Sequence, residues 1–389
     1  MIVYEDDVFK LFDYDSRLVS VLSNILNGEV REFLQAIMHP GEYFTIRVNS
    51  MLTSTDYVVK YFENLGYSVK VHPRFDEVVL VRTEGPFYVP IESKIIVADK
   101  YAAESVYQGA NLYIPGIISI NFHIRKGDYV TINAPNGFSV GWGISHINAD
   151  DLRRDKKGLA VTTLISRFKL PKVRELSIYS KGYIYSQSIP AIIASRELNP
   201  QPNEVIVDMC AAPGGKTTHI SILSKCRAKV IAVDNSRRRI NYMVKEIERM
   251  KLKNISVIRA DSRYLDVDFN IKADKVIIDP PCSALGVRPK VYDKKKYSEI
   301  VDLKEYQKQF IKPAYNILKR DGILVYSTCT ITREENEDII EYALTNFKFE
   351  LEDLEYKIGN IVFGGAAQRF YPHKHDMPGY FIAKLRKVG

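Results

Sequence analysis

Four aspartates and one cysteine stand at the ends of short apolar runs that read as β-strands: Asp208, Asp234, Asp261, Asp279 and Cys329. Helical patterns separate these runs, and regular alternation of strands and helices predicts a parallel, doubly wound α/β sheet. In such a sheet the ligand binds at the carboxyl ends of the strands. A single aspartate there is often only a structural cap, but four at successive strand ends indicate a binding site.

The turn after the first of these strands is rich in small residues. It reads Asp-Met-Cys-Ala-Ala-Pro-Gly-Gly-Lys-Thr from Asp208 to Thr217, and an apolar helix follows. Its Gly-Lys-Thr ending resembles a triphosphate-binding loop, but that loop requires a glycine where Cys210 stands. The turn still brings backbone N–H groups and a helix N-terminus up to a ligand. The alternative is a tight strand-to-helix turn without any ligand.

Asp234 ends the second strand, 26 residues after Asp208. A carboxylate at this place accepts hydrogen bonds from the two hydroxyls of a ribose in dinucleotide sites. The first turn, however, lacks the Gly-x-Gly-x-x-Gly spacing that seats a pyrophosphate. The two observations together predict an adenosine cofactor without phosphates, S-adenosylmethionine.

The elements that must position these residues form the last of three predicted domains, residues 169–389. Its strands are predicted at 204–208, 228–233, 255–258, 275–278 and 323–326, with helices from Ser236 and over 305–318. Residues 1–90 predict an N-terminal α/β unit with helices near 19–26, 33–37 and 56–65 and strands at 43–48 and 67–71. Arg47 and Asn49, near the end of one strand, are interpreted as surface polar residues. Residues 91–168 have short apolar runs separated by glycines, which is typical of a small all-β barrel.

The composition sets further limits on function. The chain has 389 residues, 46% of them hydrophobic, which is enough for two or three domains with their own cores. A net charge of +8 suits a polyanionic partner, although a basic enzyme without any nucleic-acid role is the alternative. The first residues show no leader pattern and no apolar run approaches the ~20 residues of a membrane span, so a cytoplasmic location without membrane contact is predicted.

Cysteine and histidine usage argues against metal and disulfide chemistry. Four scattered cysteines are too few for a disulfide framework, and none forms a Cys-x-x-Cys pair. His373 and His375 lie two residues apart without further ligands nearby in the sequence, which is a weak metal signal. The sequence therefore predicts no metal.

The barrel segment resembles the PUA domain, an RNA-binding module. The likeness rests on a helical run ending in Gly109-Ala110, then Pro115-Gly116-Ile117, Gly127-Asp128-Tyr129-Val130 and Gly158-Leu159-Ala160-Val161. It implies that Tyr107 and Asn111 touch a single RNA strand by stacking and hydrogen bonding. Arg125 and Lys126 would meet phosphates.

The third domain resembles the RNA cytosine-5 methyltransferases of the Nop2/Sun family. Three motifs carry the resemblance, namely Met-Cys-Ala-Ala-Pro-Gly-Gly-Lys-Thr at 209–217, Asp-Pro-Pro-Cys-Ser at 279–283 and Ser-Thr-Cys-Thr at 327–330. The added PUA-like barrel narrows the resemblance to the subgroup that methylates cytosine 72 of tRNA. It implies tRNA as partner, bound through its acceptor stem and 3′ CCA end, and no obligate protein partner. The alternatives are a ribosomal RNA substrate and an RNA-binding assembly factor without activity.

The resemblance also assigns roles to individual residues. Cys329 corresponds to the nucleophile that adds to C6 of the cytosine, and Cys282 to the cysteine that assists release. Asp279 would contact N3 or N4 of the base, and the charge of Lys216 would help to keep Cys329 ionised. Cofactor contacts are implied for Cys210, Ala211, Ala212, Pro213, Gly214, Gly215, Lys216, Asp234, Arg239, Asp261 and Asp279.

Overall fold

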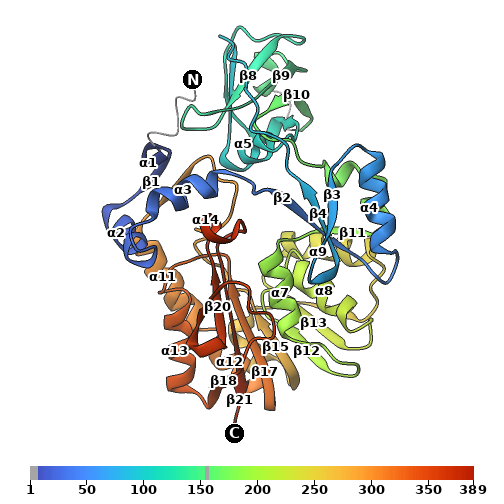
Figure 1. Ribbon diagram of the computed structural model, residues 1–389, viewed down its shortest axis with the longest axis vertical. Helices are drawn as coiled ribbons and strands as arrows, with labels where there is room; N and C mark the ends of the chain where they lie inside the picture. The colour runs from blue at the N-terminus through green and yellow to red at the C-terminus, as the bar shows by residue number, and fades with distance from the viewer. Residues whose placement is uncertain (1–7, 154–156) are drawn as a thin grey trace.

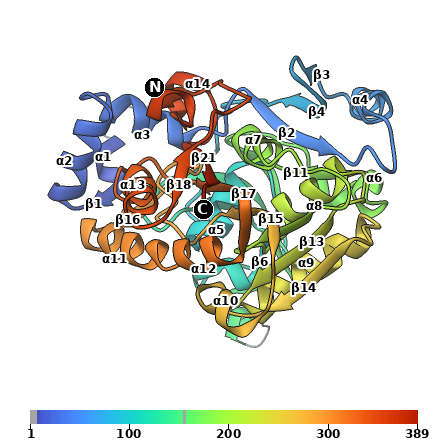
Figure 2. The same cartoon turned by 90° about the horizontal axis from the view of Figure 1, so that it is seen from below.

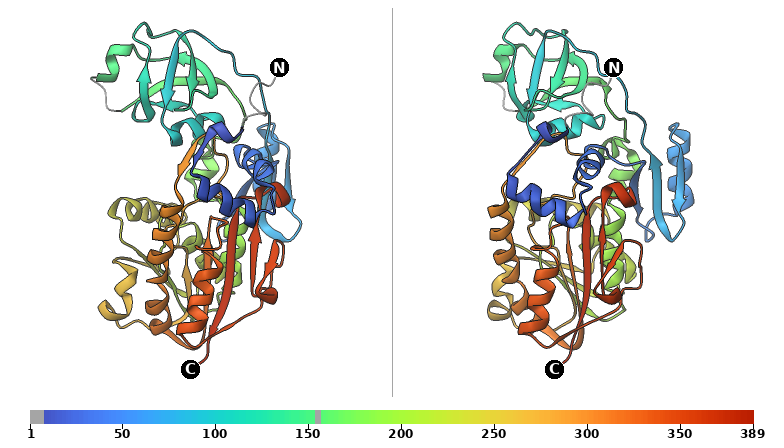
Figure 3. Two further views of the ribbon diagram at one scale, coloured as in Figure 1. Left: turned by 90° about the vertical axis from the view of Figure 1, so that its left-hand side faces the viewer. Right: turned by 60° about the vertical axis from the view of Figure 1, so that its left-hand side comes forward.

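The computed structural model describes residues 8–153 and 157–389. Figure 1 shows a small barrel at the top, an N-terminal sheet with one covering helix at the right, and a large sheet with flanking helices below. N-terminal helices lie between the barrel and the large sheet, as Figure 3 also shows. No helix in the described ranges combines the length and the apolar character needed to cross a membrane.

The large sheet has nine strands within the described part of the chain. Five neighbours are parallel, in the order β14 (Ile255–Arg259), β13 (Lys229–Asp234), β12 (Val205–Asp208), β15 (Ala273–Ile278) and β17 (Leu318–Thr328). Antiparallel strands continue the sheet beyond β17, namely β21 (Tyr380–Lys387), β20 (Ala367–Phe370) and β19 (Asn360–Val362), while β18 (Phe349–Leu351) also pairs with β21. The predicted parallel α/β sheet is confirmed.

Helices cover both faces of this sheet (Figure 2). Alternate residues of β15 show the division, because Val276 and Ile278 pack in one core cluster and Ile277 in another. The first cluster includes residues of α12 (Ile311–Ile317) and α13 (Glu337–Asn346). The second includes residues of α7 (Ile189–Glu197) and α8 (Gly215–Leu223), and α9 (Arg237–Arg249) packs beside α8 in a further cluster.

The single helix predicted over 305–318 is wrong. Two helices occupy this region, α11 (Tyr297–Lys308) and α12, and the chain breaks between them at Gln309 and Phe310. Pro313 explains the break, because it has no N–H to donate to the carbonyl of Gln309 four residues earlier. The short α10 (Leu265–Asp268) packs against α12.

The N-terminal sheet has the strand order β11-β2-β4-β3. Three strands come from the N-terminal unit, namely β2 (Tyr43–Val48), β3 (Val69–His72) and β4 (Phe75–Arg82), and α4 (Thr55–Asn64) packs on them. The fourth, β11 (Ile184–Ser186), comes from beyond the barrel. The helices α1 (Val8–Leu11), α2 (Ser16–Ile25) and α3 (Val30–Met38) belong to the same unit, and β1 (Phe12–Tyr14) pairs with β16 (Asp293–Lys295). Strand pairs therefore join segments across the predicted boundaries at residues 90 and 168.

The barrel has the strand order β6-β10-β9-β8-β5-β7. Its elements are β5 (Ile95–Ala98), α5 (Lys100–Tyr107), β6 (Leu112–Tyr113), β7 (Ile117–Ile120), β8 (Tyr129–Asn133), β9 (Ser139–Ser145) and β10 (Leu159–Ser166). Helix α5 lies at the base of the barrel and faces the rest of the molecule (Figure 1).

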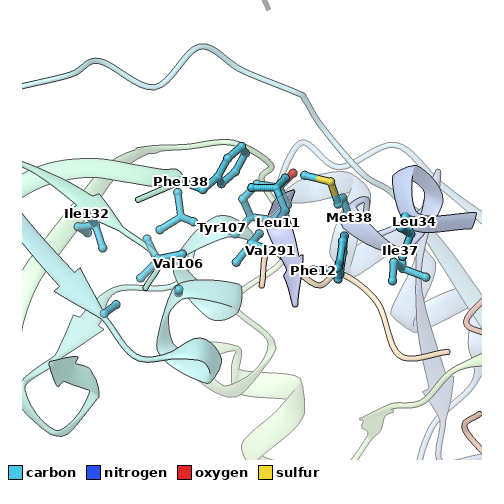
Figure 4. Close-up of a cluster of buried hydrophobic side chains, with 14 of the residues drawn as sticks. Leu11, Phe12, Leu34, Ile37, Met38, Val106, Tyr107, Ile132, Phe138 and Val291 are labelled. Carbon is cyan, nitrogen blue, oxygen red and sulfur yellow. The ribbon is translucent and has the colours of Figure 1, made fainter. Parts of the chain in front are cut away.

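The barrel shares its hydrophobic core with the other parts of the chain. One cluster of buried side chains runs from Val106 and Ile132 inside the barrel to Phe12 and Ile37 of the N-terminal unit (Figure 4). It also takes in Val291, which belongs to the segment that follows β15. Continuous apolar packing of this kind fixes the barrel in place far better than a flexible linker.

Candidate active site

Two cysteines meet at the carboxyl ends of neighbouring parallel strands. Ile278, the last residue of β15, is in register with Tyr326 of β17, so the segments that follow both strands emerge at the same edge. Cys282 lies on one segment and Cys329 on the other, and their sulfur atoms are 3.2 Å apart. The structure thus brings together two residues that lie 47 positions apart in the sequence.

The contact makes the two thiols unequal. A hydrogen bond from Cys282 lowers the pKa of Cys329. Burial and the charge of Asp279 raise this pKa, whereas the charges of Lys216 and Lys290 lower it further. The net pKa of Cys329 lies below that of an ordinary thiol, whereas the same contact and burial raise the pKa of Cys282. Cys329 is therefore the thiol that ionises first, and a thiolate is the nucleophilic form.

Asp279 and Lys216 form an ion pair beside the cysteines. Lys216 Nζ lies 2.6 Å from Asp279 Oδ2, while Ser327 Oγ and Tyr380 OH donate to Asp279 Oδ1 at 3.0 and 3.2 Å. Burial lowers the pKa of Lys216, but Asp279 and Tyr380 outweigh it, so that the net pKa is raised. Lys216 is therefore charged, and the carboxylate of Asp279 is held in one orientation.

A buried carboxylate, Glu335, holds the two cysteine segments together. Its oxygens accept hydrogen bonds from the N–H and hydroxyl of Ser283 at 2.8 and 2.6 Å and from Thr332 Oγ1 at 2.8 Å. Ser283 follows Cys282, and its hydroxyl also lies 2.7 Å from the hydroxyl of Thr330, which follows Cys329. Glu335 has no signal in the sequence, because it lies in an acidic run that resembles a solvent-exposed surface.

The glycine-rich turn is fixed from inside the sheet. Thr217 Oγ1 donates to Asp208 Oδ2 at 2.7 Å, which ties the start of α8 back to the end of β12. Gly214 precedes α8 with a φ of +103°, and a Cβ at this position would lie 2.9 Å from the Met243 side chain. Only glycine suits both the conformation and the space.

Arg47 and Asn49, interpreted from the sequence as surface polar residues, are fully buried. Arg47 donates to Gly215 O at 2.7 Å, to Thr218 Oγ1 at 2.8 Å and to Gln187 Oε1. Asn49 donates to Gly182 O and Met250 O, both at 3.1 Å. The interpretation is wrong because β11 and α8 pack over this end of β2, which local sequence does not reveal. The N-terminal sheet therefore supports the turn.

A groove runs along the strand ends beside the turn. It is lined by Met209, Cys210, Asp234, Asn235, Arg239, Ala260, Asp261, Ser262, Pro281, Tyr306 and Phe310. Asp234 accepts hydrogen bonds from Ala212 N at 3.2 Å, Ser236 N at 2.9 Å and Arg239 Nη2 at 3.0 Å. The Arg239 side chain is 44% exposed, so it can yield its place to a ribose hydroxyl. An aromatic wall and a carboxylate are groups that would contact the base and the ribose hydroxyls of an adenosine.

Asp261 differs from Asp234, because its carboxylate already has a strong partner. Arg263 Nε and Nη2 lie 2.9 and 2.6 Å from its two oxygens. The hydrogen bonds from Arg263 lower the pKa of Asp261. A ligand that contacts the Asp261 side chain therefore does so while Asp261 remains paired with Arg263.

The comparisons with known proteins cover both the barrel and the large sheet. Residues 195–386 match the family model described as 16S rRNA methyltransferase RsmB/F, and residues 94–164 match the PUA domain model. The tRNA (cytosine(72)-C(5))-methyltransferase of Pyrococcus horikoshii is 41% identical over 92% of this chain and 93% of its own length. The human tRNA (cytosine(72)-C(5))-methyltransferase NSUN6 is 28% identical over 91% of this chain and 85% of its own length.

This chain belongs to the Nop2/Sun family of RNA (cytosine-C5)-methyltransferases. The crystal structure of NSun6 from Pyrococcus horikoshii with SFG agrees, with a TM-score of 0.90 and 40% identity over 97% of this chain and 99% of that chain. The predicted family, the Rossmann-like methyltransferase fold, the PUA domain and the cofactor S-adenosylmethionine are confirmed.

The PUA domain of this methyltransferase corrects one predicted RNA contact. Tyr107 is 1% exposed, and its ring packs against Phe138 and Phe168 with centroids 6.0 and 5.2 Å away. It therefore belongs to the core and cannot stack on a base. Asn111 is partly engaged, since its Oδ1 accepts from Thr163 N at 3.1 Å and from Lys172 Nζ at 3.4 Å.

The other residues that the sequence singled out lie at the surface of the methyltransferase or away from the two cysteines. Arg125 and Lys126 are exposed, as phosphate contacts require. His373 Nε2 lies 3.3 Å from Glu29 Oε2, and His375 Nδ1 accepts from Tyr371 N at 2.9 Å. Among the residues that the structure describes, no group of three His, Cys, Asp or Glu side chains is arranged to hold a metal.

The support from the N-terminal sheet can be tested with Arg47→Met. We expect a loss of S-adenosylmethionine affinity of at least tenfold, because the Gly215 carbonyl loses the donor that fixes the cofactor turn. Thermal unfolding should change less, because burial lowers the pKa of Arg47 to about 10, and removing a buried cation offsets lost hydrogen bonds.

Calorimetric titration with S-adenosylmethionine measures the affinity, and Arg82→Met, at an exposed position of β4, is the control. An unchanged affinity in Arg47→Met would show that the turn keeps its shape without this contact.

Proposed function

We propose that this enzyme transfers a methyl group from S-adenosylmethionine to C5 of cytosine 72 in the acceptor stem of tRNA. One observation carries the proposal. The likeness to the Pyrococcus horikoshii tRNA (cytosine(72)-C(5))-methyltransferase extends over 92% of the chain and therefore includes the barrel as well as the catalytic domain. We infer that the barrel, as an added RNA-binding module, selects the substrate.

In the proposed reaction Cys329 is the nucleophile. Its thiolate adds to C6 of the cytosine, and the electron pair of the C5–C6 bond becomes available at C5. Bound S-adenosylmethionine supplies the methyl group that C5 takes. A water molecule then takes the C5 proton, the C5–C6 double bond forms again and the S–C6 bond breaks, which restores the thiolate. Cys282, with its raised pKa, keeps its proton and assists this release by donating a hydrogen bond to the departing sulfur of Cys329.

Asp279 and Lys216 complete the proposed catalytic set. The fixed carboxylate of Asp279 accepts a hydrogen bond from the cytosine amino group at N4, or from N3 when it is protonated. Lys216 lowers the pKa of Cys329 and holds Asp279 through the 2.6 Å ion pair. Both roles follow from the position of the pair beside the cysteines.

For the cofactor we propose the turn and the groove together. The backbone from Cys210 through Lys216 would surround the methionine part, and Asp234 would accept from the ribose hydroxyls with Arg239 beside it. Asp261 would lie near the adenine. The proposal is supported by the groove, which joins the turn to Asp234 and Asp261.

For the barrel we propose that it holds the single-stranded 3′ CCA end. Helix α5 faces the catalytic domain, and Tyr101 of α5 and Tyr113 of β6 are exposed, so these rings replace Tyr107 as candidates for stacking on bases. Asn111 retains its amide N–H groups for hydrogen bonding, and Arg125 and Lys126 would contact phosphates. Cytosine 72 must leave the stacked stem at a cost of a few kcal/mol, which binding of the adjoining single strand offsets.

The proposal also keeps the division of the chain at 1–90, 91–168 and 169–389, a cytoplasmic location and activity without an obligate protein partner. A ribosomal RNA substrate is the alternative within the family. The matched model named for 16S rRNA methyltransferases spans only the catalytic domain, so it does not account for the barrel. An inactive assembly factor is disfavoured by the intact cysteine pair.

The roles of the cysteines can be separated by trapping. Cys329→Ala should abolish both methylation and any covalent RNA adduct, because it removes the nucleophile. Cys282→Ala should methylate at most once and keep an adduct with tRNA that survives denaturing electrophoresis, because release fails. Cys226→Ala is the control, since Cys226 contacts Ser221 away from the pair. Adducts in Cys329→Ala but not in Cys282→Ala would invert the two roles.

The substrate can be tested with tRNA transcripts that carry or lack the terminal CCA. We expect loss of CCA to lower methyl transfer at least tenfold while leaving S-adenosylmethionine affinity unchanged, because only the barrel contact is lost. Incorporation of labelled methyl measures the rate, and ribosomal RNA fragments of equal length serve as comparison. Equal rates with and without CCA would move substrate selection away from the barrel.

A further inference from the structure

The segment that follows Cys282 leaves the large sheet and touches both other parts of the molecule. Residues 284–293 are called the 284–293 loop. In this loop Lys290 N donates to Ile37 O of α3 at 2.7 Å, and Val291 O accepts from Asn136 Nδ2 of the barrel at 2.9 Å. Val291 also lies in the shared hydrophobic core (Figure 4). The three parts of the chain therefore meet on this loop.

Lys290 is a buried cation of the loop, with only 3% of its side chain exposed, and it differs from the equally buried Arg288, which pairs with Asp376. Its Nζ donates to Ala284 O at 2.5 Å and pairs with Asp293 Oδ2 at 2.9 Å. Burial lowers the pKa of Lys290, and Asp293 opposes that shift. A buried ammonium group is costly unless it is paired and hydrogen-bonded, so both partners are needed to keep it there.

The carbonyl of Ala284 belongs to the turn that fixes both cysteines. Ala284 has a φ of +56°, a left-handed conformation that a residue other than glycine adopts only when its surroundings hold it. Ala284 O also accepts from Val287 N at 3.2 Å, and Gly286 N donates to Cys329 O at 3.1 Å. Cys282 lies two residues before Ala284. Lys290 therefore stabilises a turn that connects Cys282 with Cys329, in addition to the hydrogen bonds of Glu335.

The ion pair between Lys290 and Asp293 is also connected to the barrel. Asp293 Oδ1 accepts from Lys100 Nζ at 2.6 Å, and Lys100 is the first residue of α5. Tyr14 OH of β1 donates to Asp293 Oδ2 at 3.1 Å. Glu104, also on α5, interacts with the charges of Lys100, Lys290 and Asp293, and burial raises its pKa to about 7. Charged contacts thus lead from α5 through Asp293 and Lys290 to the cysteine turn.

We propose that Lys290 is a positioning residue for Cys282 and Cys329. Through its ion pair with Asp293, the relative position of the two cysteines depends on the docking of helix α5. The inference rests on the proposed chemistry of the cysteine pair but not on the identity of the RNA. Its consequence is that the barrel does more than hold substrate. A barrel that is not docked against the rest of the molecule leaves the cysteine turn unsupported. Efficient methyl transfer therefore requires both the docked barrel and the supported turn.

The test compares three substitutions in the full-length enzyme. Lys290→Met removes the donor to Ala284, Lys100→Met breaks only the barrel end, and Lys294→Met is the control, because Lys294 lies next to Asp293 but is 60% exposed. We expect Lys290→Met to lower kcat at least tenfold with an unchanged KM for S-adenosylmethionine. The pH midpoint for iodoacetamide modification of Cys329 should move upward, because a nearby cation is lost. Lys100→Met should lower kcat in the same direction by a smaller factor.

Equal kcat and equal alkylation profiles in Lys290→Met and Lys294→Met would overturn the positioning role. Unchanged kcat in Lys100→Met would overturn the link between α5 and the cysteine pair. If Lys290→Met does not fold, the kcat of Lys100→Met still tests this link. Alkylation requires neither RNA nor cofactor. Loss of the Lys290 charge by itself moves the midpoint, so the positioning role is supported by a changed alkylation rate at high pH, where Cys329 is ionised in every variant. Such a change in an enzyme that is inactive on every tRNA would reject only the proposed substrate.

Discussion

The contact between the sulfur atoms of Cys282 and Cys329 is the constraint on which the rest of this structure depends. The two sulfur atoms lie 3.2 Å apart, and their contact lowers the pKa of Cys329 and raises that of Cys282, so that Cys329 ionises first while Cys282 remains protonated. Parallel neighbouring strands bring the two segments to one edge, but they do not fix positions beyond the last paired residue. The hydrogen bonds of Glu335 and the turn at Ala284 supply that precision.

The supports of this site come from parts of the chain that carry no chemistry themselves. Arg47 reaches from the N-terminal sheet to the carbonyl of Gly215 and thereby supports the glycine-rich turn. Lys100 reaches from the barrel to Asp293. Because buried charged groups need several partners to offset the loss of water, each such contact also specifies how two parts of the chain are arranged. The glycine-rich turn, the cysteine pair and the barrel are thus linked through a few buried polar groups.

Local sequence patterns predicted the residues at the strand ends but not their supports. Asp208, Asp234, Asp279 and Cys329 follow apolar runs, and parallel strands must end at one edge, so their proximity followed from periodicity alone. Arg47, Glu335 and Lys290 look like ordinary surface residues in the sequence, because their burial depends on segments that are distant along the chain. Tyr107 shows the opposite error, since Phe138 and Phe168 cover a ring that the family resemblance suggested would face RNA.

The ionisation of Cys329 tests the central claim most directly, namely that Cys282 sets the reactivity of the nucleophile by donating a hydrogen bond to it. The measurement is the rate of iodoacetamide modification of Cys329 against pH, followed by mass spectrometry in the native enzyme, in Cys282→Ala and in Cys282→Ser. We expect a midpoint below the ordinary thiol value of about 8.5 in the native enzyme. It should rise in Cys282→Ala and return toward the native value in Cys282→Ser, which keeps a donor. The same midpoint in all three proteins, or faster modification of Cys282 than of Cys329 in the native enzyme, would contradict the account.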